Sequence, residues 1–180
     1  MRNLHIKSLF IITALIAASF TFTNGPKPKK KKAKAKTETV AAPVDEIVKA
    51  DTIAWYNFND GFAKAKKQGK ILVIDTYTDW CGWCKKMDHD TYENPDIIAK
   101  MNQYCIAVKF NPENNGSYNI NGKIYNQQQL LTWLAKGSNR GYPTTFIWVK
   151  PNADEKVYME VGYRDATDFN TTLNSYIALK

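Results

Sequence analysis

Runs of apolar residues with the length and composition of β-strands organise the middle and the end of the chain. Residues 70–77 and 104–110 are almost continuously apolar, which is typical of strands covered on both faces in a parallel sheet. Residues 144–150 and 156–161 are two further runs, and the turn residues between them predict a β-hairpin. A shorter aromatic-rich run at 53–58 predicts a first strand.

Between these strands, apolar residues recur at the three-to-four-residue spacing of amphipathic helices. Residues that favour helix ends, such as Gly69 and Pro95, separate the segments. The expected helices run from a cap at Asn59 or Asp60 to Gln68, from the paired cysteines to about Tyr92, from Asp96 to Asn102, from Gln127 to Lys136, and from a cap at Asp165 or Thr167 past Ile177. Strands that alternate with helices predict an α/β domain with a central mixed sheet flanked by helices.

A small β-hairpin is expected as an insertion in this domain. The segments 118–120 and 123–125 flank Asn121-Gly122, a strong signal for a two-residue hairpin turn. The surrounding residues are polar, so we expect the hairpin to project from the domain. The whole domain is expected to cover residues 44–180, because a chain of this length can enclose one sizeable core.

The first 23 residues have the pattern of an export signal. Arg2 and Lys7 precede an almost wholly apolar stretch from Leu9 to Phe22, with small residues near its end. This stretch is shorter than the ~20 apolar residues of a membrane-spanning helix. We therefore expect residues 1–23 to be a cleaved signal peptide, with an uncleaved N-terminal anchor as the alternative. The protein is then periplasmic or otherwise exported.

Residues 24–43 are expected to be a disordered, lysine-rich linker, because they contain almost no large apolar residues. The formal net charge is +8, but all 17 acidic residues follow Thr37, whereas nine of the 25 lysines and arginines precede it. The remaining chain is close to neutral, which argues against nucleic acid as a partner. The lysines from Lys27 to Lys36 are either a solvated spacer or a contact with an anionic surface of the cell envelope.

Cys81 and Cys84 form a C-x-x-C motif between the strand at 70–77 and the helix that follows it. Unpaired backbone N–H groups at a helix N-terminus favour the thiolate of the first cysteine, and the thiolate is the form that attacks disulfides. The context therefore predicts a redox-active dithiol.

A metal site and a purely structural disulfide are the alternatives for this pair. A metal site would have Cys81, Cys84 and His89 but no evident fourth ligand, so no metal or other cofactor is expected. The third cysteine, Cys105, begins a predicted buried strand and is expected to behave as a small apolar side chain. A regulatory or intermolecular disulfide is its alternative.

Two separate motifs resemble the thioredoxin superfamily. The first is Val73-Ile74-Asp75 followed by Trp80-Cys81-Gly82-Trp83-Cys84-Lys85, and the second is Arg140-Gly141-Tyr142-Pro143-Thr144-Thr145. The stretch 55–86 is similar to exported thioredoxin-like proteins, in particular the C-terminal domain of the bacterial disulfide-reducing DsbD conduit. The resemblance implies a thioredoxin fold and an exported, monomeric thiol–disulfide oxidoreductase that reduces or isomerises disulfides in proteins. A membrane protein is the expected electron donor.

The same resemblance implies roles for single residues. Cys81, as the first and more exposed cysteine, is expected to be the nucleophile, and Cys84 is expected to be the resolving thiol. Asp75 matches a buried acid that accepts the proton of the resolving thiol, and an exposed aspartate at a strand end is its alternative. Lys109 matches a lysine that often faces this acid, with an ordinary strand-edge lysine as its alternative.

Four further residues are expected to bind the substrate. The resemblance implies a cis peptide bond at Pro143, whose neighbour Tyr142 would offer backbone groups to an extended substrate segment. A trans-proline that begins a strand is the alternative. Trp80 is expected to pack beside the motif, either shielding it or lying in the core. Trp83 is expected to be exposed as an apolar platform, with packing in the core as its alternative.

The dipeptide between the cysteines, Gly82-Trp83, contains no histidine of the kind found in strongly oxidising relatives. We therefore favour a reductant or an intermediate potential. A different class of function, a thioredoxin-fold module that binds a protein partner and keeps the disulfide only for structure, remains the alternative.

Overall fold

The computed structural model describes residues 51–138 and 141–180. The predicted signal peptide (1–23), the predicted linker (24–43) and the predicted start of the domain at Val44 lie outside these residues. The core of the domain is one five-stranded sheet in the order β1-β3-β2-β6-β7. These strands are β1 (Trp55–Tyr56), β2 (Ile71–Thr76), β3 (Cys105–Phe110), β6 (Thr144–Trp148) and β7 (Val157–Val161). β3 runs parallel to β1 and β2, whereas β6 runs antiparallel to β2 and β7, which confirms the mixed sheet.

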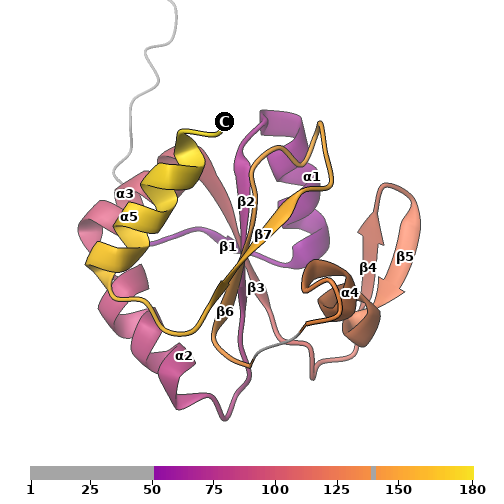
Figure 1. Cartoon of the computed structure of the whole chain (residues 1–180), viewed down its shortest axis with the longest axis horizontal. Coiled ribbons are helices and arrows are strands. Elements are labelled where there is room, and N and C mark those ends of the chain that lie inside the picture. The colour runs from indigo at the N-terminus through magenta and orange to yellow at the C-terminus, as the bar shows by residue number, and fades with distance from the viewer. Residues whose placement is uncertain (1–50, 139–140) are drawn as a thin grey trace, which may run out of the picture. The chain divides into compact units, whose positions relative to one another are not determined.

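Helices cover both faces of the sheet (Figure 1). One face carries α2 (Gly82–Met87), the short π-helix η1 (Asp88–Tyr92), called the π-turn below, α3 (Pro95–Tyr104) and α5 (Ala166–Ile177). The other face carries α1 (Phe58–Gln68) and α4 (Gln127–Leu134). The residues of β2 alternate between the two apolar cores, with Leu72 and Ile74 in one and Ile71 and Val73 in the other. Successive side chains of β2 enter opposite cores, so both of its faces are buried. This explains why its sequence is an almost continuous apolar run.

The close packing of α1 on the sheet depends on Gly61. A Cβ atom at this position would lie 2.2 Å from Cγ2 of Val108 in β3. A residue without a side chain therefore lets the helix approach the strand. Residues of α1 such as Phe58 and Phe62 are then buried in the core on this face.

The inserted hairpin consists of β4 (Ser117–Ile120) and β5 (Lys123–Asn126), as the sequence predicts. Asn121 and Gly122 both have positive φ, 52° and 88°, which is the conformation that Asn-Gly turns favour. The hairpin does not simply project from the domain, because Ile120 and Tyr125 are buried in the core shared with α1 and α4.

The beginning of the domain differs from the prediction. The first strand contains only Trp55 and Tyr56, and Asn57 caps α1 by accepting a hydrogen bond from the N–H of Asp60 at 3.0 Å. The predicted cap at Asn59 or Asp60 is therefore wrong. A side-chain oxygen at Asn57 captures a helix N–H as soon as the chain leaves β1, so the helix starts earlier.

The segment after the cysteines also differs from one continuous helix. α2 ends at Met87, and the chain continues as a π-turn from Asp88 to Tyr92 before α3. Asn94 caps α3 by accepting hydrogen bonds from the N–H groups of Asp96 and Ile97. None of the helices within residues 51–138 and 141–180 has both the length and the apolar character that crossing a bilayer requires.

Candidate active site

Cys81 and Cys84 form a disulfide with an S–S distance of 1.99 Å. It lies where the chain leaves the buried end of β2 and enters α2. The N–H of Cys81 donates a hydrogen bond of 3.1 Å to the carbonyl of Thr78, which closes the turn between these elements. The pair is therefore held between the sheet and a helix N-terminus, as the sequence predicts.

The two cysteines are almost equally buried in this disulfide form. Cys81 is 4 % exposed and Cys84 is 3 % exposed, so burial does not distinguish the two sulfur atoms. Helix geometry distinguishes them. Cys81 is the N-cap of α2, and its Sγ accepts a hydrogen bond of 3.1 Å from the N–H of Cys84. A negative charge on Cys81 would be stabilised by this N–H and by the helix dipole.

Asp75 is the second-to-last residue of β2, and its side chain is buried. The sheet register places it between Lys109 of β3 and Thr145 of β6. Burial raises the pKa of Asp75, and the attraction of Lys109 only partly offsets this effect. The alternative of an exposed aspartate at a strand end is therefore wrong.

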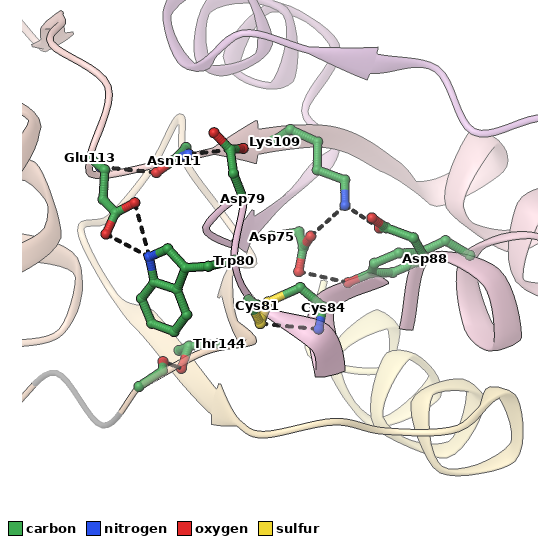
Figure 2. The surroundings of a disulfide bond; sticks show 12 residues. Asp75, Asp79, Trp80, Cys81, Cys84, Asp88, Lys109, Asn111, Glu113 and Thr144 are labelled. Atoms are coloured by element: carbon green, nitrogen blue, oxygen red, sulfur yellow. Dashed lines mark hydrogen bonds and ion pairs between the residues drawn. A yellow bond between two sulfur atoms is a disulfide. The ribbon is translucent and has the colours of Figure 1, made fainter. Parts of the chain in front are cut away.

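Lys109 faces this carboxyl. Its Nζ lies 2.7 Å from Oδ2 of Asp75 and also forms an ion pair with Asp88 of η1 (Figure 2). Burial lowers the pKa of Lys109, but the two carboxylates more than offset it, so the pKa is raised. Tyr92 donates a hydrogen bond of 3.2 Å from its hydroxyl to the other oxygen of Asp75. Both oxygens of Asp75 therefore have a partner.

Sequence reasoning did not identify Asp88 or Tyr92 as members of this group. Asp88 lies four positions after Cys84, so it was a candidate for the same helix face, but the sequence contained no sign of its partner. The π-turn changes which side chains point toward the sheet between Asp88 and Tyr92. Its hydrogen-bond pattern is not readable from the apolar spacing.

Trp80 does not lie in the core, so that interpretation is wrong. The side chain is 68 % exposed, and its Nε1–H donates hydrogen bonds of 2.9 and 3.2 Å to the two carboxylate oxygens of Glu113. Figure 2 places this pair on one side of the disulfide and the Asp75–Lys109–Asp88 group on the other. Glu113 was another residue that the sequence did not single out.

Two aromatic pairs flank the disulfide. The ring of Trp80 meets that of Tyr142 edge-on, with the centroids 5.9 Å apart. Trp83 is 59 % exposed, which confirms the prediction for this residue, and its ring lies 5.4 Å from that of Tyr163. Two exposed tryptophan rings thus lie next to the cysteines in the chain, each in contact with a tyrosine ring.

The Tyr142–Pro143 peptide bond is cis. The carbonyl of Pro143 accepts a hydrogen bond of 2.9 Å from the N–H of Gly162, which joins the start of β6 to the segment after β7. Tyr142 is half-buried beside Trp80. Tyr142 and Pro143 therefore belong to the surroundings of the disulfide although they lie about 60 positions away in the chain.

Cys105 is a free, buried thiol, and burial raises its pKa to about 12. This agrees with its prediction as a small apolar side chain. Within the described residues, no group of three or more histidine, cysteine or acidic side chains is arranged to hold a metal ion.

A sequence model of the thioredoxin-like DsbH family, described as proteins of unknown function (DUF255), matches residues 39–175. The chain belongs to this family. This confirms the predicted membership of the thioredoxin superfamily and the predicted resemblance to DsbD-like domains.

Among curated proteins, the chain is similar to the thiol:disulfide interchange protein DsbD of Photorhabdus laumondii, with 29 % identity over 104 residues. It is also similar to the human spermatogenesis-associated protein 20, with 26 % identity over 102 residues. These matches cover 58 % and 56 % of this chain but only 16 % and 12 % of the relatives. The chain therefore spans a small part of the length of these relatives.

Two solved structures share the fold. A DsbH oxidoreductase has a TM-score of 0.52 at 17 % identity, with 81 % of this chain and 96 % of that chain covered. A thioredoxin from Thermus thermophilus has a TM-score of 0.53 at 18 % identity, with 69 % and 86 % covered. The thioredoxin fold is thus confirmed, and the family and its relatives support a thiol–disulfide redox role in general terms.

Proposed function

We propose that this protein is an exported thiol–disulfide oxidoreductase that reduces or isomerises disulfides in other proteins. The observation that carries the proposal is the Cys81–Cys84 disulfide at the N-terminus of α2, with the buried carboxyl of Asp75 behind it (Figure 2). A structural disulfide has no need of a buried titratable group, whereas thiol exchange needs a proton acceptor.

The proposed reaction begins with the reduced dithiol. The Cys81 thiolate attacks one sulfur of a substrate disulfide, forms a mixed disulfide and releases the other substrate sulfur as a thiolate. Cys84 then gives its proton to Asp75 and attacks Sγ of Cys81. This step forms the Cys81–Cys84 disulfide and releases the second substrate thiolate. Two electrons have passed from the dithiol to the substrate, and an external dithiol must then reduce the Cys81–Cys84 disulfide to restore the starting form.

The N-cap geometry supports this order of attack. The N–H of Cys84 points at Sγ of Cys81, so the charge that develops on a thiolate is best stabilised at Cys81. Asp75 suits proton exchange with a thiol, because burial moves the pKa of its carboxyl upward, toward that of a thiol.

We propose that the substrate docks on the aromatic surface around the disulfide. Trp80 and Trp83 are both largely exposed, and exposed aromatic side chains are enriched at protein interfaces. Tyr142 and Pro143 complete this surface, and the backbone of Tyr142 is proposed to pair with an extended substrate segment.

The location and partners are part of the same proposal. The apolar pattern of residues 1–23 supports export, and residues 24–43 are proposed to be a linker to a monomeric domain that starts at residue 44. The lysines from Lys27 to Lys36 are proposed to contact the cell envelope, and a membrane protein is proposed as the electron donor.

The binding-module alternative also has an observation in its favour, since both sulfur atoms are almost fully buried in the disulfide form. The reduction potential separates the two functions. A structural disulfide is expected below about −300 mV, whereas a disulfide exchanger lies above that value.

Insulin reduction tests the proposed function. We expect Cys81→Ser to abolish activity and Cys84→Ser to accumulate mixed disulfides with substrate proteins. Cys105→Ala is the matched control, because this thiol is buried and unpaired, and it should keep activity. Full activity in Cys81→Ser would refute the proposal.

A further inference from the structure

The ammonium group of Lys109 lies among three aromatic rings from three separate segments. Nζ is 4.7 Å from the ring centroid of Trp55 in β1, 5.2 Å from that of Tyr92 in η1, and 5.3 Å from that of Tyr77 after β2. A cation within about 6 Å of a ring centroid is attracted by the negative face of the ring. We call Trp55, Tyr77 and Tyr92 the aromatic cage.

The cage restrains a side chain that has two competing carboxylate partners. Asp75 is fully buried, whereas Asp88 is partly exposed to solvent. A lysine ammonium on its flexible stem readily turns toward water and toward the more accessible of two anions. Movement of Nζ away from Asp75 would weaken its contacts with these three rings, so the rings oppose this movement.

Trp55 is placed for this task by the sheet register. It pairs with Ala107, two positions before Lys109 in β3, so the side chains of Trp55 and Lys109 lie on the same face of the sheet. The ring of Trp55 also meets that of Tyr92 edge-on, with the centroids 5.0 Å apart. The two-residue strand β1 thus contributes one ring directly to the surroundings of Lys109.

Solvent approaches Lys109 through a neighbouring pocket of about 350 Å³. Trp55, Tyr92, Asp88 and Lys109 line it together with Asp51 and Glu93. The charged and titratable groups around Lys109 are therefore Asp75 from β2, Asp88 and Tyr92 from η1, Tyr77, and the two acidic residues of this pocket. Loss of the Trp55 ring would widen the route by which water reaches the ammonium group.

We propose that Trp55, Tyr77 and Tyr92 are positioning residues that hold the Lys109 ammonium against Asp75, and that the cage thereby sets the proton affinity of this carboxyl. The importance of the cage for catalysis rests on the proposed function, in which Asp75 accepts a proton. The cage itself is a property of the disulfide form and can be tested without turnover.

The test is a titration of Asp75 in the full-length, oxidised protein by carboxyl ¹³C NMR. Trp55→Leu should move the midpoint upward by roughly half a pH unit, the shift that corresponds to the loss of one partly buried cation–π contact. Lys109→Met should move it upward further. In the Lys109→Met background, Trp55→Leu should cause no additional shift, because the ring then has no cation to hold.

Tyr56→Leu is the matched control. Tyr56 is the neighbour of Trp55 in β1, and its ring lies 4.8 Å from Nζ of Lys64 instead. This variant should leave the Asp75 titration unchanged. If Trp55→Leu does not fold, Tyr77→Leu replaces it, both in the wild-type protein and in the Lys109→Met variant.

Two results would overturn the inference. One is an unchanged midpoint in Trp55→Leu, and the other is an equal shift with and without Lys109, which would show that Trp55 acts through packing alone. Failure of the proposed function is a separate outcome. Full insulin reduction by Cys81→Ser would refute the function while leaving the titration result intact.

Discussion

Lys109 and Asp75 form an ion pair of 2.7 Å between neighbouring parallel strands, although they lie 34 positions apart in the chain. The pair lies behind the disulfide, on the side away from Trp80 (Figure 2). Burial is the larger influence on Asp75, and it raises the pKa of the carboxyl despite the lysine. Asp75 therefore lowers the stability of the folded protein whenever it is ionised.

Asp75→Asn should accordingly stabilise the protein in a pH-dependent way. The folded protein binds the Asp75 proton more tightly than the unfolded chain, whose aspartate pKa is about 3.9. The stability of the wild type therefore falls as the pH rises from about 4 through the raised pKa, and the variant lacks this loss. The gain should reach about 1.4 kcal/mol for each unit by which the folded pKa exceeds the unfolded one.

Chemical denaturation of the oxidised protein between pH 4 and pH 8 measures this difference. Asp168→Asn is a suitable control, because Asp168 is exposed in the first turn of α5. This variant measures the effect of losing one exposed carboxylate. A stability difference between Asp75→Asn and wild type that shrinks with rising pH would contradict the prediction.

Glu113→Ala should weaken the binding of protein substrates without changing the chemistry of the dithiol. Glu113 accepts both hydrogen bonds of the Trp80 indole, so its removal frees an exposed ring that the proposed docking surface needs in a fixed position. We expect KM for a protein disulfide to rise about 3- to 10-fold, corresponding to the roughly 1 kcal/mol that a typical intramolecular hydrogen bond contributes. The rate with a small disulfide should stay the same.

Ile124→Ala is the matched control for this experiment. Ile124 is an exposed apolar side chain on β5, within the inserted hairpin. Both KM for the protein disulfide and the rate with the small disulfide should be unchanged in this variant. An equal loss of rate with small and protein disulfides in Glu113→Ala would show that the glutamate acts on the dithiol rather than on docking.

Gly61→Ala should destabilise the domain by about 1–3 kcal/mol, because the added methyl group would collide with Val108 and push α1 away from β3. Thermal or chemical unfolding measures the loss. Gly82→Ala provides the comparison, since no atom lies within 4 Å of a Cβ at that position. It should leave stability unchanged or raise it by up to about 1 kcal/mol. Similar losses in both variants would rule out the steric explanation.

Features that depend only on neighbouring residues could be predicted from the sequence. The strand, the dithiol and the following helix lie close together in the chain, so their order predicts both the position of Cys81 and the helix N-terminus beside it. The turn at Asn121-Gly122 was predictable for the same reason, because its backbone conformation is a local property of these two residues.

Which distant residues meet around the disulfide depends on how the elements pack against one another. Glu113 reaches Trp80, and Asp88 and Trp55 reach Lys109, through strand register and the π-turn, which are set by packing rather than by local propensity. The equal burial of Cys81 and Cys84 likewise results from the whole surrounding surface. The hydrophobic pattern predicts which elements form, but contacts between side chains depend on how those elements pack.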